Sequence, residues 1–293
     1  MTELLPILLK ITVIIFMVGN LLELGLRLDL KKAMAGLRDV RFVTLSLLWA
    51  FVLCPALAYL LGVALPLTEP YAMGLLLLGL APCAPLLPGM VDKAHGDVNY
   101  AASFMLLASA GTVVYMPLAV PLLVKGLTVS AWTVAQPMLF LVMLPLVVGI
   151  AVQMRRPSTA SLLQPYVKKI TAVDTLLMLL VVVAMYGKGF AAAIGTWAIL
   201  AQVLFFTITI VGSYALAFGV PPGRKCVMTL GLSTRNCGAA LGPLFVATDA
   251  APEATVMVTL GIPMMVLFSV IAARVFAGRA GPADAAIPGA AKT

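Results

Sequence analysis

The stretch LGLAPCAPLLPG, residues 78–89, interrupts an apolar run with three prolines, Pro82, Pro85 and Pro88, spaced three residues apart. Each proline removes a backbone N–H donor and crowds the preceding turn, so a continuous helix is not expected here. Carbonyl groups freed by such a break cannot face lipid, and the segment must therefore lie inside protein or against a cavity. A simple packing kink is the structural alternative.

A second apolar run is broken by the polar stretch GLSTRNCG, residues 231–238. Arg235 lies about ten residues beyond the inner edge of this run, or roughly 15 Å deep at the helical rise. An arginine at that depth costs about 2.5–3.5 kcal/mol to insert, and such residues are usually functional. The neighbouring Ser233, Thr234 and Asn236 can solvate the guanidinium, or can instead hydrogen-bond adjacent helices.

The composition is that of a membrane protein: of 293 residues, 62% are hydrophobic and 10% charged, and the mean hydropathy is +1.11. Soluble domains carry about 25% charged residues. The net charge of +8 is assigned to cytoplasmic loops and not to nucleic-acid binding. Four cysteines without a CxxC pair and one histidine, His95, predict neither a disulfide framework nor a metal site, and no cofactor is expected.

Nine apolar runs are long enough to span a bilayer, which takes about 20 residues per helix. Their approximate limits are 4–26, 41–65, 71–91, 97–124, 133–153, 169–188, 195–219, 225–248 and 253–276. The connections between successive runs alternate between the two sides of the membrane. Those on one side hold fifteen lysines and arginines, and those on the other side hold two, Lys125 and Lys188. The positive-inside rule therefore predicts a multi-pass inner-membrane protein with an external N-terminus and a cytoplasmic C-terminus.

These runs predict an all-α fold with a single transmembrane domain, residues 1–280, and a disordered cytoplasmic tail, 281–293. The two broken spans are five runs apart, an odd offset that inverts one against the other. Paired interruptions of this kind indicate a secondary transporter built from inverted repeats, here about 4–124 and 133–277. The N-termini of half-helices carry partial positive charge and would favour an anionic substrate.

The chain resembles the bile acid:sodium symporter family, in the superfamily that includes arsenite and auxin-type carriers. The similar segments are GLRL at 25–28, Cys54-Pro55, residues 79–82, and NCG at 236–238. The resemblance implies a nine-helix form with repeats of four and five helices and two crossing broken helices. It also implies transport of a small organic anion by alternating access.

The same resemblance places the family's sodium ligands at positions that have lost their oxygen-bearing side chains. These positions are Ala50, Leu87, Pro88, Ala101, Met105 and Gly231, and one further position has become the cation Arg235. Sodium needs hard oxygen ligands, and a carboxylate helps to neutralise it. A proton, or no coupling ion, is therefore favoured over sodium, and a guanidinium in the place of sodium is one way to achieve this.

The predicted substrate site consists of Arg235, Asn236, Ser233 and Thr234 from the second break, with Pro85 and Pro88 from the first. Arg235 is expected beside the crossing as the anion-recognising charge, or else as a structural partner of Glu23 or another acid. Glu23 and Asn20 are the candidate coupling residues. An i,i+4 surface pair with Arg27 explains Glu23 equally well, and Asp174 is expected to be interfacial.

Besides a passive channel, two rival functions remain open. The first is an arsenite- or auxin-type efflux carrier, in which the Cys83 thiolate would suit a soft ion, although buried cysteines commonly serve as small apolar residues. The second is an intramembrane enzyme, which would need a nucleophile–base pair or a metal motif. The sequence has no HExxH and no GxSxG motif.

The topology is testable with a reporter that is active only in the cytoplasm. A fusion after Lys292 should be active, and an insertion at Lys125 should be silent, because the basic connections lie on the cytoplasmic side. The opposite pattern would overturn both the orientation and the number of spans.

Overall fold

The computed structural model describes residues 4–84, 86–124, 129–247 and 251–277, and within these ranges the fold is all helical, without a strand. In the part of the chain that the structure describes, seven helices are long and apolar enough to cross a membrane. They are α1 (Leu4–Arg27), α3–η1–α4 (Val40–Leu48, Trp49–Leu53, Cys54–Ala64), α7 (Val98–Leu123), α8–η2–α9 (Ala131–Pro137, Met138–Met143, Leu144–Arg155), α10 (Pro157–Ala193), α11 (Ala198–Ala215) and α14 (Pro252–Ala277).

Both apolar runs that were expected to break are broken. The first consists of α5 (Glu69–Leu80) and α6 (Leu87–Lys93), and the second of α12 (Pro222–Ser233) and α13 (Cys237–Val246). Three residues separate the second pair, and their backbone leaves the helical region, with Thr234 at φ −90° and ψ 130°. The proline triplet and the polar cluster thus interrupt helices where the sequence predicted.

Two helical segments differ from the sequence expectation. Helix α10 begins at Pro157, well before the predicted start at residue 169, and its added turns are rich in polar residues that hydropathy does not register. The short helix α2 (Leu30–Gly36) occupies what was predicted as a loop, and its N-cap, Asp29, accepts a hydrogen bond from the Lys32 N–H. The predicted tail, 281–293, lies outside the described ranges.

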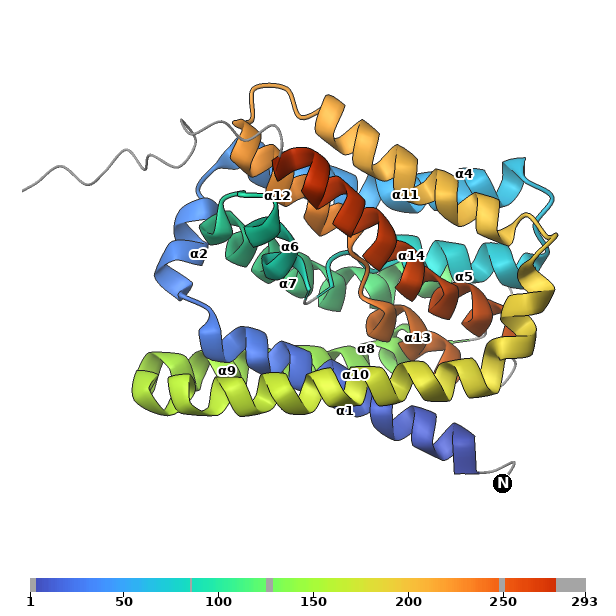
Figure 1. Ribbon diagram of the computed structural model, residues 1–293, viewed down its shortest axis with the longest axis horizontal. Coiled ribbons are helices and arrows are strands. Elements are labelled where there is room, and N and C mark those ends of the chain that lie inside the picture. Colours follow the sequence, from blue (N-terminus) through green and yellow to red (C-terminus); the bar gives the residue numbers. More distant parts are fainter. Residues whose placement is uncertain (1–3, 85, 125–128, 248–250, 278–293) are drawn as a thin grey trace, which may run out of the picture.

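The helices form two layers, which Figure 1 shows most clearly. Helices α1, α9 and α10 run together along one side, and α4, α5, α11, α12 and α14 lie on the other side. Helix α13 lies between them, in contact with α1 as well as with α14 and α5. The second broken helix therefore reaches from the second layer toward the first.

The first layer is closely packed at a pair of facing glycines. A Cβ atom on Gly25 of α1 would lie 2.5 Å from the carbonyl oxygen of Leu146 and 2.8 Å from the Cα atom of Gly149 on α9. A Cβ on Gly149 would in turn meet the backbone of Leu22 and Gly25. Small residues allow helix backbones in membranes to approach this closely and pack by van der Waals contact.

We expect Gly25→Ala to destabilise the protein by about 1–3 kcal/mol, because the added methyl group meets rigid backbone and not a mobile side chain. The matched control is Gly187→Ala on α10, where a Cβ atom would meet only Val183 at 4.0 Å. Thermal unfolding of the purified variants should show a clear loss for the first and none for the second. Equal melting temperatures would contradict the close contact of α1 and α9.

Candidate functional site: a helix crossing beside an interlayer cavity

The two broken helices cross and hydrogen-bond to each other through their non-helical segments. The Cys83 N–H donates to the Thr234 carbonyl at 2.8 Å, and the Asn236 N–H donates to the Ala81 carbonyl at 3.0 Å. Pro82 lies opposite Arg235 in an antiparallel bridge, where its missing N–H is not needed. Each break therefore satisfies backbone groups that the other has freed.

Side chains of the second break cap the half-helices on either side of it. The Ser233 and Thr234 hydroxyls both donate to the Leu230 carbonyl at 3.0 Å, within the last turn of α12. The Asn236 side chain accepts from the Ala239 N–H at 3.0 Å and is the N-cap of α13. These three predicted substrate ligands thus have local structural partners, and Ser233 and Thr234 are fully buried.

The Arg235 side chain is also fully buried. Its Nη1 donates to the Gly79 carbonyl at 3.3 Å, and its Cζ lies 4.9 Å from the centroid of the Phe205 ring on α11. Arg235 lies beside the crossing, as expected, but it points into the second layer. A structural pair with Glu23 does not form, because Glu23 is bonded to Arg27 and Gln164.

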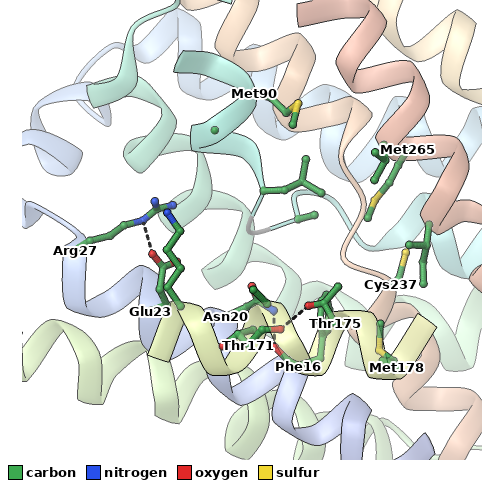
Figure 2. Close-up of a pocket in the computed structure, with 17 residues that line it drawn as sticks. Phe16, Asn20, Glu23, Arg27, Met90, Thr171, Thr175, Met178, Cys237 and Met265 are labelled. Atoms are coloured by element: carbon green, nitrogen blue, oxygen red, sulfur yellow. Dashed lines mark hydrogen bonds and ion pairs between the residues drawn. The ribbon is translucent and has the colours of Figure 1, made fainter. Parts of the chain in front are cut away.

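A cavity of about 390 Å³ lies between the two layers (Figure 2). Helices α1 and α10 form one wall, and α14 and both breaks form the other, where Cys237 is the first residue of α13. Figure 2 shows the ion pair Arg27–Glu23 at one end and the sulfur-bearing Met178, Met265 and Cys237 at the other. The cavity is therefore polar at one end and apolar at the other.

The charged end of the cavity carries an excess of positive charge. Arg27 and Lys168 are its cations and Glu23 is its carboxylate, a formal sum of +1. The Glu23 carboxylate lies 3.6 Å from Arg27 Nε and accepts a hydrogen bond of 2.7 Å from Gln164. Among the described residues Lys168 forms no ion pair, so its ammonium group can meet a ligand.

The candidate coupling residues both border the cavity. The Asn20 amide donates to the Phe16 carbonyl at 2.7 Å, and Glu23 makes the i,i+4 pair with Arg27 that the sequence offered as an alternative. A different carboxylate is less well satisfied: Asp174 on α10 is only 6% exposed, and its Oδ2 has no partner among the described residues. Asp174 is thus buried within the protein, and its interfacial position in the membrane stays a prediction.

The remaining predicted positions contribute little to the cavity. Pro88 lies in the first turn of α6 between the lining residues Leu86 and Gly89 without lining the cavity itself, and Pro85 lies outside the described residues. Five of the positions at which the resemblance places sodium ligands are buried and offer no side-chain oxygen, namely Ala50, Leu87, Ala101, Met105 and Gly231. The Phe104 ring fills the space into which a side chain at position 231 would extend.

Lys168, Thr171 and Thr175 are polar lining residues that sequence reasoning missed. They share one face of α10, with spacings of three and four, and both threonine hydroxyls donate to carbonyls one turn earlier. Lys168 was placed in a cytoplasmic connection because it lies between the apolar runs 133–153 and 169–188. The helical spacing of these polar residues was a signal available in the sequence. It was missed because Lys168, the first of them, lies before the most apolar part of the helix.

Comparison with known proteins agrees with the resemblance. The model of the sodium bile acid symporter family matches residues 12–193. The matched range contains the first break, together with the α1 and α10 walls of the cavity, and ends before α11. A search of curated proteins found no match.

The backbone at Cys83 has φ +65°, a left-handed conformation that β-branched side chains rarely adopt. Cys83→Val should therefore cost about 1–2 kcal/mol more than Cys54→Val, whose site is also buried but helical, at φ −67°. Thermal unfolding of the two variants measures this difference. Equal losses would show that the crossing does not impose the left-handed backbone.

Proposed function

The chain belongs to the sodium bile acid symporter family, and on this premise we propose that it is a secondary active transporter of a small organic anion. The interlayer cavity is the proposed substrate site. The observation that carries the proposal is its combination of a surplus positive charge with an apolar end between two helix layers. Binding sites in transporters commonly lie where broken helices meet the opposing layer.

The lining favours an anion that also has an apolar part. Lys168 supplies a point charge with three donors for a carboxylate or similar group. Thr171, Thr175 and Asn20 add hydrogen-bonding groups in the middle, and the methionines and Cys237 offer polarisable apolar contact. The N-terminus of α13, which begins at Cys237, adds partial positive charge to this wall.

The proposed mechanism is alternating access between the two layers. The proposal counts each pair of half-helices as one span, which with the seven long apolar helices of the described residues makes nine, arranged as repeats of four and five. The close packing of α1 on α9 supports movement of the first layer as a unit relative to the second layer, from which the cavity separates it. We place the protein in the inner membrane with the C-terminus and the Lys168 end of the cavity on the cytoplasmic side.

Sodium coupling is not part of the proposal, since the positions expected to supply its ligands carry apolar side chains. Protonation of a carboxylate, or no coupling ion, is favoured. Asp174 joins Glu23 as a candidate, because unpaired carboxyl groups inside membranes are commonly functional.

The arsenite-type carrier gains no support, because Cys83 does not line the cavity. Membership of a transporter family argues against an intramembrane enzyme.

Uptake by proteoliposomes from a panel of labelled organic anions, with and without sodium, tests the proposal. We expect saturable uptake of at least one amphipathic carboxylate, and competition by its close analogues. Uptake of uncharged analogues with equal affinity, or no saturable uptake of any organic anion, would refute the assignment.

Lys168→Gln should raise KM for the transported anion about tenfold, since it removes one charge-assisted hydrogen bond. The matched control is Lys169→Gln, which removes the same charge from the next position on α10, outside the cavity. Concentration-dependent uptake by the two variants gives the comparison. If Lys169→Gln weakens uptake as much as Lys168→Gln, only the general surface charge matters.

A further inference from the structure

The C-terminal ends of two half-helices meet at the crossing. Helix α5 ends at Leu80 and α12 ends at Ser233, and their following residues bond to each other. The C-terminal end of a helix carries roughly half a negative charge on its unpaired carbonyl groups. In transporters with broken helices, such ends and the unwound carbonyls beside them attract cations. The crossing is therefore a place of concentrated negative potential inside the membrane.

The Arg235 guanidinium occupies this place. It donates to the carbonyl of Gly79, the second-to-last residue of α5, at 3.3 Å. Phe205 presents its ring 4.9 Å from the guanidinium carbon, a cation–π arrangement that stabilises a desolvated positive charge. The whole residue is 0% exposed, so neither water outside the protein nor the interlayer cavity reaches it.

No ion pair accounts for this buried charge. The ion pairs among the described residues involve Arg27, Lys32 and Arg224, and none involves Arg235. Its Nε and Nη2 have no partner among the described residues. A buried acceptor without a partner, Gln202 Oε1, lies on the same helix as Phe205, one turn away. Dipoles and a ring thus compensate the positive charge, and no carboxylate does so.

We infer that Arg235 is a resident cation, a positive charge built into the crossing, which holds the ends of α5 and α12 together so that no metal cation is needed there. The inference deepens the proposed function by assigning how the crossing beside the cavity manages without a metal cation. Its uptake measurements rest on that proposed function. A guanidinium suits this role because it stays protonated and spreads its charge over several donors.

Thermal unfolding of the purified full-length protein in sodium, potassium and choline chloride is the first test. The wild-type melting temperature should be the same in all three salts, because a ligand that binds the folded state must raise stability. Arg235→Ala should lose several degrees, and millimolar guanidinium should restore part of the loss. Arg235→Lys should lose less than Arg235→Ala. Arg155→Ala, at an exposed arginine ending α9, should neither lose stability nor respond to guanidinium.

Two results would overturn the inference. One is a saturable sodium-dependent rise in the wild-type melting temperature that potassium does not reproduce, a measurement that needs no variant to fold. The other is an Arg235→Gln protein with unchanged melting temperature and abolished uptake, which would assign Arg235 to anion recognition. The proposed function fails separately, by the absence of organic-anion uptake in wild-type proteoliposomes, while the unfolding measurements still decide the role of Arg235.

Discussion

The structure depends on the rule that a backbone polar group inside a membrane must find a partner within the protein. Two helices break in this chain, and each break frees groups that water cannot satisfy. The paired bonds Cys83–Thr234 and Asn236–Ala81 solve the problem for both at once. Neither break is tolerable without the other, so the crossing fixes where α5, α6, α12 and α13 lie and where the opposing layer finds its cavity.

The crossing also separates two electrostatic environments. On one side the Arg235 guanidinium donates to the Gly79 carbonyl at the end of α5. On the other side α13 begins at Cys237, next to a cavity whose walls carry Lys168 and Arg27. The polarity of the half-helices thus provides a cation-compatible side and an anion-compatible side within one short stretch of backbone.

Hydropathy and breaker residues predicted both breaks and the long apolar helices, because prolines and buried polar groups act locally. The direction of the Arg235 side chain could not be predicted, since helical periodicity stops at the break and only the packed neighbours Gly79 and Phe205 decide it. The start of α10 could not be predicted either. The apolar run begins only at residue 169, so Lys168 was placed in a connection, whereas the helix begins at Pro157 and packs against α1.

A positive charge that belongs to the protein has a consequence for the energetics of the transport cycle. Arg235 returns with the empty carrier, so the net charge moved in one cycle is that of the substrate and any ion that accompanies it. For a monovalent anion moving alone, an interior-negative voltage of 100 mV contributes about 2.3 kcal/mol. That energy corresponds to a concentration ratio of roughly fiftyfold in the outward direction. Without a companion ion, the voltage across the membrane would make such a carrier an exporter.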